Sequence, residues 1–155
     1  MSDDQGQFSP ATAVNPYLSF NSFALRSRPE LGVRMSAAQY FASLAPDRRA
    51  MAIAIRKTLL HSKTLREEMA VNPSGDIVMY ADQGRHVFGL VDRKDGVRLY
   101  ALGLPLIRPV LKKYGPKFGK LRVGVYCFRF RRLDEIDQPL LKDFVREIGN
   151  LSATS

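Results

Sequence analysis

The clearest structural signal in this chain is the stretch Gly124-Val-Tyr-Cys-Phe-Arg-Phe-Arg-Arg-Leu-Asp-Glu-Ile-Asp137. Basic and aromatic residues alternate through its middle, and strict alternation is the pattern of a half-buried β-strand. The apolar repeat that follows Asp137 predicts a helix with an aspartate N-cap. The residues of that repeat are Leu141, Phe144, Val145 and Ile148. We therefore predict a strand over 121–131 and a final helix that ends at Gly149-Asn150.

The two faces of this strand differ in chemistry. Phe128 and Phe130 point one way while Arg129 and Arg131 point the other, because side chains alternate along an extended chain. We expect the rings to enter the core, which turns both guanidinium groups toward water. Arginines in such a position suit an anion or a nucleic-acid backbone. The alternative is a solvated sheet face whose arginines pair with nearby carboxylates.

Two helices are predicted upstream. Ser36-Ala-Ala-Gln39 has the form of a capping box, in which hydroxyl and amide side chains satisfy backbone N–H groups at a helix start. Pro46 suits the first turn of a second helix that runs to about His61. Its apolar stripe, at four-residue spacing, consists of Met51, Ile55 and Leu59.

The middle of the chain predicts strands joined by tight turns. Apolar alternation begins near Ile77, and the dipeptides Gln83-Gly84 and Asp95-Gly96 separate it into three segments. A short helix is predicted within 105–114, ended by Gly115-Pro116. Together these segments predict an α+β domain with a largely antiparallel sheet of about four to five strands and helices packed on one face.

Composition sets further limits. The chain has 155 residues, 45% of them apolar, and no apolar run approaches the length of a membrane span. Its N-terminus has no secretory h-region, and Cys127 is the only cysteine, so we expect a cytoplasmic protein without membrane association. The formal net charge of +9 favours contact with anions but is equally typical of a highly soluble domain.

The domain boundaries follow from periodicity. Residues 1–35 show no sustained period and predict an irregular, partly disordered N-terminal arm. The arm is nevertheless rich in apolar residues, namely Phe8, Tyr17, Leu18, Phe20, Phe23 and Leu25. We expect these to lie on the domain or on a neighbouring subunit, which would give a homo-oligomer through the arm. Residues 36–150 form the domain, and 151–155 form a tail.

Basic residues gather toward the C-terminal half of the chain. They define a predicted anion-binding surface that consists of Lys112, Lys113, Lys117, Lys120, Arg122, Arg129 and Arg131. The partner would be an anionic small molecule or a nucleic acid. A solvated, unoccupied charge cluster is the alternative interpretation.

Catalytic and metal chemistry have weaker candidates. Tyr100, Tyr126 and Cys127 could line a small pocket on the sheet, with the thiol activated by neighbouring arginines, although core packing explains the same residues. A hard cation could use carboxylates, and the candidate set is Glu67, Glu68 and Asp134. Helix capping and turn formation account for such carboxylates equally well.

From Tyr40 onward, over about 110 residues, the chain resembles the YdhG-like bacterial domains of unknown function. The best match is Gly124-x-x-Cys127-Phe-x-Phe130-Arg-Arg-Leu133-x-x-Ile-Asp137, supported by Asp92-Arg-Lys94 and Val97-Arg-Leu-Tyr100. The resemblance implies a small α+β domain, commonly without an assigned reaction. Some members are described as frataxin-like iron chaperones, so it also implies iron as an alternative cofactor or cargo. Where relatives often carry Gly-Lys before the cysteine, this chain has Gly124-Val125.

These observations lead to three functional hypotheses. The first is a small non-enzymatic binding domain whose basic surface takes an anionic ligand or partner, without a cofactor. The second is an intracellular iron chaperone, and the third is an enzyme of unknown reaction at the Tyr100, Tyr126 and Cys127 pocket.

Overall fold

A computed structural model describes residues 35–72, 75–102 and 107–154. The elements in this part of the chain are α3 (Ala37–Ala42), α4 (Pro46–Leu60), β1 (Arg66–Asn72), β2 (Gly75–Asp82), β3 (Arg85–Arg93), β4 (Gly96–Ala101), α5 (Arg108–Phe118), β5 (Cys127–Phe130) and α6 (Gln138–Thr154). The strands form one antiparallel sheet in the order β1-β2-β3-β4-β5. The α+β class with an antiparallel sheet is thereby confirmed. The predicted arm lies outside the described residues except for Met35.

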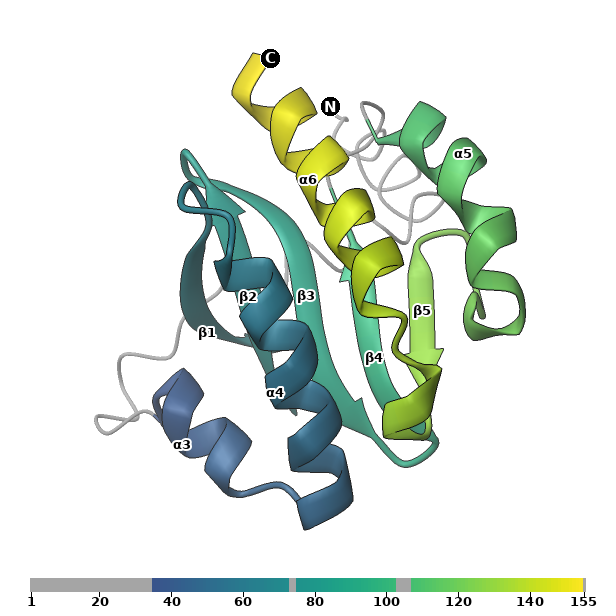
Figure 1. The fold of residues 1–155 in the computed structure, drawn as a ribbon. Helices are drawn as coiled ribbons and strands as arrows, with labels where there is room; N and C mark the ends of the chain where they lie inside the picture. The colour runs from purple at the N-terminus through teal and green to yellow at the C-terminus, as the bar shows by residue number, and fades with distance from the viewer. Residues whose placement is uncertain (1–34, 73–74, 103–106, 155) are drawn as a thin grey trace, which may run out of the picture.

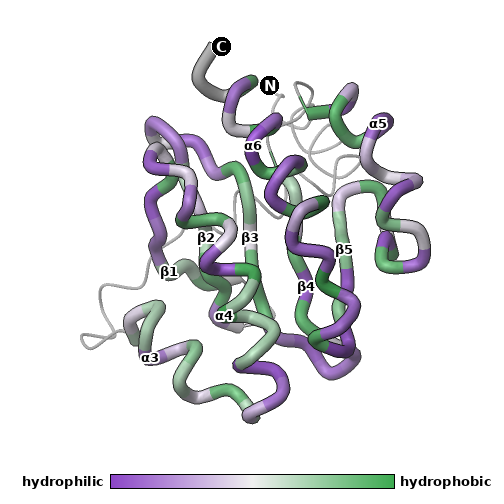
Figure 2. Tube along the Cα trace, in the orientation of Figure 1, coloured by the Kyte–Doolittle hydropathy of each residue, from purple (hydrophilic) through white to green (hydrophobic). Residues whose placement is uncertain are grey.

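The helices cover one face of the sheet. Figure 1 shows α4 and α6 in front of the strands, α3 next to α4 below the β1 side of the sheet, and α5 beside the β5 edge. Phe144 of α6 lies at the centre of this layer, with its ring centroid 5.4 Å from that of Phe128 and 5.3 Å from that of Phe118. Figure 2 shows β3 hydrophobic along much of its length, whereas hydrophobic and hydrophilic turns alternate along α6. This is the contrast between a buried strand and an amphipathic helix.

The side chains of β5 point as predicted. Phe128 and Phe130 are fully buried at 0% exposure on the helix side. Arg129 is directly opposite Arg98 of β4, on the other face of the sheet. The aromatic residues therefore close the core, which confirms the predicted orientation of this strand.

The two tight hairpins rest on unusual backbone angles. Gln83 and Gly84 have φ values of 53° and 80°, and such paired positive angles match the twist of the strands that the turn joins. Gly96 has φ 143°, and a Cβ atom there would meet the Phe130 carbonyl oxygen at 2.6 Å. Glycine is required at 96 because β5 approaches too closely for any side chain.

Two predicted helix caps are present. Ser36 Oγ accepts a hydrogen bond from the Gln39 N–H at 3.1 Å, and the Gln39 side chain accepts from the Ser36 N–H at 2.8 Å. Asp137 Oδ1 accepts from the Leu140 N–H at 3.1 Å. Both helices start where their sequence signals indicate.

Other boundaries were predicted wrongly. α5 continues through Gly115-Pro116 to Phe118, because Phe118 packs on Phe128 at 4.6 Å between ring centroids and this contact extends the helix past the proline. α6 likewise passes Gly149-Asn150 and includes part of the predicted tail, ending at Thr154. Burial of Ile148 holds that last part against the domain.

The strand expected over 121–131 is reduced to Cys127–Phe130. Residues Gly119–Leu121 form a 3₁₀ turn, and Arg122 then pairs with Phe128 in an isolated antiparallel bridge. The chain doubles back on itself before β5, so a continuous strand is excluded. β1 was not among the predicted strands, because its Arg-Glu-Glu start hides the alternation. Among the described helices, none combines the length and apolar character that crossing a membrane would need.

Candidate anion-binding groove

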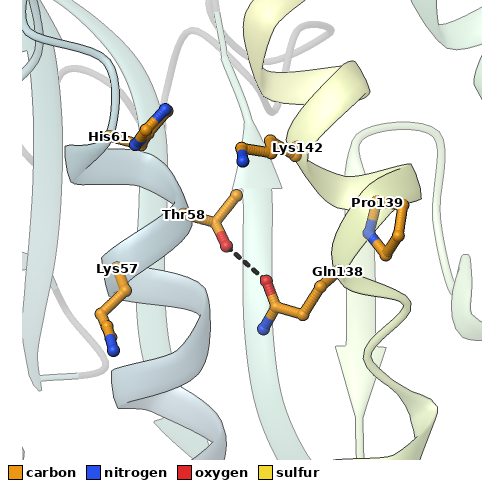
Figure 3. Close-up of a pocket in the computed structure, with 6 residues that line it drawn as sticks. All are labelled: Lys57, Thr58, His61, Gln138, Pro139 and Lys142. Atoms are coloured by element: carbon orange, nitrogen blue, oxygen red, sulfur yellow. Dashed lines mark hydrogen bonds between the residues drawn. The ribbon is translucent and has the colours of Figure 1, made fainter.

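Two adjoining hollows lie between the end of α4 and the first half of α6. The first has a volume of about 370 Å³ and is lined by Lys57, Thr58, His61, Gln138, Pro139 and Lys142. The second has a volume of about 270 Å³, shares Thr58, His61 and Lys142, and extends past Ser62 and Thr64 to Arg146 and Asn150. We call the two together the α4–α6 groove. Figure 3 shows the side chains that line its first part.

The groove is cationic. Lys57 and His61 lie four residues apart and therefore on the same side of α4, and Lys142 approaches from α6 (Figure 3). Among the residues that line either hollow, none is a carboxylate. No ion pair joins Lys57 or Lys142 to an acid elsewhere in the described chain. Arg146 differs, because it pairs with Asp143 at 2.6 Å.

Polar side chains hold the two helices together across the groove. Thr58 is buried, and its hydroxyl donates to Gln138 Oε1 at 2.7 Å (Figure 3). This bond uses the oxygen of the Gln138 amide, so the amino group of the same side chain remains as a hydrogen-bond donor in the lining. The lining thus combines two ammonium groups, an imidazole and an amide N–H donor, which are groups that bind anions.

The predicted lysines occupy a different surface. Lys112 and Lys117 of α5 and Lys120 just beyond it are exposed, and none of the three forms an ion pair within the described ranges. Lys113 donates to Glu147 of α6 at 2.7 Å. We call Lys112, Lys117 and Lys120 the α5 lysine row.

The predicted arginines are less available than the lysines. Arg122 donates to the Val125 carbonyl oxygen at 3.1 Å, and its guanidinium occupies the space that a Cβ atom on Gly115 would need. Arg129 donates to Asp95 Oδ2 at 3.1 Å and its side chain is only 22% exposed. Both guanidinium groups therefore already have oxygen acceptors.

Arg98 is a further residue of this cluster that the sequence did not single out. Its Nη2 lies 2.5 Å from Asp95 Oδ2, so a single carboxylate serves both Arg98 and Arg129. The hydrogen bond from Arg98 lowers the pKa of Asp95 to about 2. Arg131 lies beyond the strand and is exposed. Arg131 is thus separated from Arg129, whose positive charge is largely compensated by Asp95.

The residues of the predicted sheet pocket are only partly brought together. Tyr100 is directly opposite Cys127 in the β4–β5 register, whereas Tyr126 precedes the strand and packs against the core. Cys127 is 8% exposed, and Arg98 Nη1 lies 3.9 Å from its sulfur. Burial nevertheless raises the pKa of the Cys127 thiol above its ordinary value, because desolvation outweighs the arginine charge.

The candidate metal ligands point in different directions. Glu67 faces the helix layer, where Arg56 and Tyr80 bind it, and Glu68 faces the other side of the sheet, with His86 at 2.8 Å. Asp134 lies beyond β5 and pairs with Arg132 at 3.1 Å. Within the described ranges, no three His, Cys, Asp or Glu side chains converge as a metal site would require.

Sequence reasoning did not find the α4–α6 groove. Lys57 and Lys142 are separated by more than eighty positions, and each is an ordinary polar residue on the outer side of an amphipathic helix. Only the packing of α4 beside α6, through the Thr58–Gln138 bond, brings them together. No short-range signal in the chain carries that information.

Comparison of the chain with family models, curated proteins and solved structures finds no match. The resemblance to YdhG-like domains therefore stays a prediction.

Proposed function

We propose that this chain is a small binding domain that takes an anionic ligand in the α4–α6 groove. The observation that carries the proposal is the lining itself, to which two helices contribute Lys57, His61 and Lys142, with no carboxylate among the lining residues. The first hollow, at about 370 Å³, also falls in the size range of small-ligand sites. The end of α4 and the start of α6 carry opposite dipole charges that roughly offset, so the side chains decide the local potential.

The proposal is tested by titrating the full chain with inorganic pyrophosphate in a calorimeter at low ionic strength. The variant Lys57→Gln/Lys142→Gln removes the two unpaired ammonium groups while keeping the length of most of each side chain. We expect its affinity to be at least tenfold weaker, because one hydrogen bond to a charged group contributes about 1.5–3 kcal/mol.

Lys112→Gln/Lys117→Gln is the matched control, since it removes the same two charges from the α5 lysine row. We expect this control to bind pyrophosphate within about threefold of the unchanged chain, the change that a long-range charge effect would cause. Equal losses in both variants would mean that net charge alone attracts the anion. An unchanged chain that takes up no pyrophosphate would also overturn the groove assignment.

A second candidate is a nucleic-acid partner on the α5 lysine row. It is favoured by the exposure of Lys112, Lys117 and Lys120. The first two lie on α5, which is about 16 Å long, and the third lies just beyond its end. Three phosphate contacts give a logarithmic salt slope of about −2 for single strands, or about a twentyfold loss of affinity between about 50 mM and 200 mM salt. In this experiment Lys112→Gln/Lys117→Gln is the test variant and should lose oligonucleotide binding. Lys57→Gln/Lys142→Gln becomes the control and should keep it.

The other two hypotheses are supported less. An enzyme that uses Cys127 as nucleophile would need a thiolate near neutral pH, and burial shifts the thiol pKa in the opposite direction. Iron binding by Glu67 and Glu68 together would need both carboxylates on one face of β1, yet neighbouring strand residues face opposite ways. A single cysteine suits a reducing compartment, so we place the proposed activity in the cytoplasm.

A further inference from the structure

The second hollow of the α4–α6 groove differs in chemistry from the first. It shares Thr58, His61 and Lys142 with the first hollow, so the two are continuous. Of the charged side chains that it adds, there is only Arg146, which is paired with Asp143. The groove therefore has a cationic end and a neutral polar end. The uncharged polar residues that the second hollow adds are Ser62, Thr64 and Asn150.

The neutral end carries hydrogen-bonding groups that can both donate and accept. Ser62 Oγ and Thr64 Oγ1 lie 3.2 Å apart and form one hydrogen bond, in which either oxygen can be the donor. Because each hydroxyl has one donor and two acceptor positions, the pair keeps one donor and further acceptors for a ligand. The Asn150 amide adds a carbonyl oxygen and an NH₂ group to the same lining. Neighbouring donors and acceptors of this kind complement the adjacent hydroxyl groups of a sugar.

We propose that the groove takes a phosphorylated sugar, an inference that rests on the anion site proposed above. The phosphate occupies the first hollow, beside Lys57 and Lys142. The sugar ring occupies the second hollow, where its hydroxyl groups bind Thr64 and Asn150. Along α6 the rise from Lys142 to Asn150 is about 12 Å, so there is length for one ring beyond the phosphate. The volume of the second hollow is about 270 Å³.

The same lining favours a sugar over a nucleobase. Bases bound by proteins commonly stack on aromatic side chains. Among the described residues that line either hollow, none is Phe, Tyr or Trp. Val145 and Gly149 instead supply a small apolar surface, which suits the C–H groups of a sugar ring. A phosphorylated sugar therefore matches both ends of the groove, whereas a nucleotide matches only the cationic end.

The first test compares ligands on the unchanged full chain by calorimetry at low ionic strength. Glucose 6-phosphate and ribose 5-phosphate each carry one phosphate, so inorganic phosphate is the matched reference for charge. We expect at least one of the two sugar phosphates to bind at least fivefold tighter than inorganic phosphate, because each neutral hydrogen bond adds a few-fold in affinity. If pyrophosphate binds but neither sugar phosphate exceeds inorganic phosphate, the anion site stands and the sugar inference is overturned. Absence of binding by all four ligands would overturn both.

The second test removes hydrogen-bonding groups from the neutral end. Thr64→Val/Asn150→Leu replaces two exposed polar side chains with apolar ones of similar shape. We expect its affinity for the sugar phosphate to fall to that for inorganic phosphate, since the lost bonds were made to the sugar alone. Pyrophosphate should bind within about twofold of its affinity for the unchanged chain, because the lysines remain. Equal losses for both ligands, or no loss for the sugar phosphate, would overturn the inference.

A third variant fills the neutral end without removing a polar group. A Cβ atom on Gly149 would lie 3.9 Å from Ser62 Oγ, which is an ordinary contact distance. Leucine also suits a helix better than glycine, so we expect Gly149→Leu to fold. It should abolish the preference for the sugar phosphate and leave the affinity for inorganic phosphate within about twofold of the unchanged value. A retained preference would mean that the sugar binds elsewhere, and would overturn the inference.

Discussion

Arg56 of α4 donates two hydrogen bonds to the carboxylate of Glu67 in β1, each 2.7 Å long. Tyr80 donates to the same carboxylate at 2.8 Å and is itself fully buried. The Arg56 guanidinium also lies 5.1 Å from the centroid of the Phe41 ring. One carboxylate thus links α4 to two strands of the sheet.

Neutralising this carboxylate should destabilise the fold. Glu67→Gln removes the charge that two donors share, and we expect a loss of about 1–3 kcal/mol in the free energy of unfolding, measured with urea. Glu68→Gln is the control one residue away, on the other face of β1, where the side chain is 52% exposed. That change should cost less than about 1 kcal/mol. Similar losses in both variants would mean that Glu67 has no special role in joining the layers.

A mutant cycle can test the contact between Gly115 and Arg122. Glycine inside a helix usually costs about 1 kcal/mol relative to alanine. Here a Cβ atom on Gly115 would displace the Arg122 guanidinium and its 3.1 Å bond to the Val125 carbonyl oxygen. We expect Gly115→Ala to change the free energy of unfolding by less than about 0.5 kcal/mol in the unchanged chain. The same change should stabilise an Arg122→Ala chain by about 1 kcal/mol. Equal effects in the two backgrounds would rule out the contact.

The Asp95 cluster should contribute to stability at acid pH. Hydrogen bonds from Arg98 lower the pKa of Asp95 from its ordinary 3.8 to about 2. Since the folded pKa lies below the unfolded one, this contribution is fully present above about pH 4 and is lost as the pH falls toward 2. The urea midpoint measured across this range should fall less steeply for Asp95→Asn than for the unchanged chain. Parallel curves would contradict the assignment.

Cys127 should behave as a buried thiol. Burial raises its pKa above the ordinary value of 9.0, although Arg98 opposes the shift. The ultraviolet absorbance of the thiolate should therefore appear only above about pH 9 in the folded chain. A midpoint near neutral pH would instead indicate an activated thiol and would revive the enzyme hypothesis. Urea-unfolded protein supplies the reference titration for the same residue.

Local signals predicted much of the fold. The hydroxyl and amide of Ser36 and Gln39, the carboxylate of Asp137 and the Asp95-Gly96 turn act over three or four residues, so the sequence alone reveals them. The orientation of Phe128 and Phe130 followed from alternation in the same way. Pro116 was misleading because a helix can continue past proline when packing, here that of Phe118, outweighs the lost bond.

The candidate site was harder to predict than the fold. Arg129 could be placed on the correct face, but its pairing with Asp95 depends on the hairpin that brings Asp95 beside β5. Lys57 and Lys142 come to line the same groove only after α4 and α6 have packed together. The net charge predicted an anionic partner, and the tertiary structure was needed to show which cationic side chains line one groove.

The order of the sheet has a consequence for how the chain folds. Each strand pairs with the next one along the sequence, and the β2–β3 and β3–β4 connections, which lie within the described ranges, are two-residue turns. Contacts this local cost little loop-closure entropy, so the hairpins β2–β3 and β3–β4 should form early and refolding should be fast for a sheet protein. α6 comes last in the chain yet packs beside α4, so its docking should complete the core and set the pace of the final step.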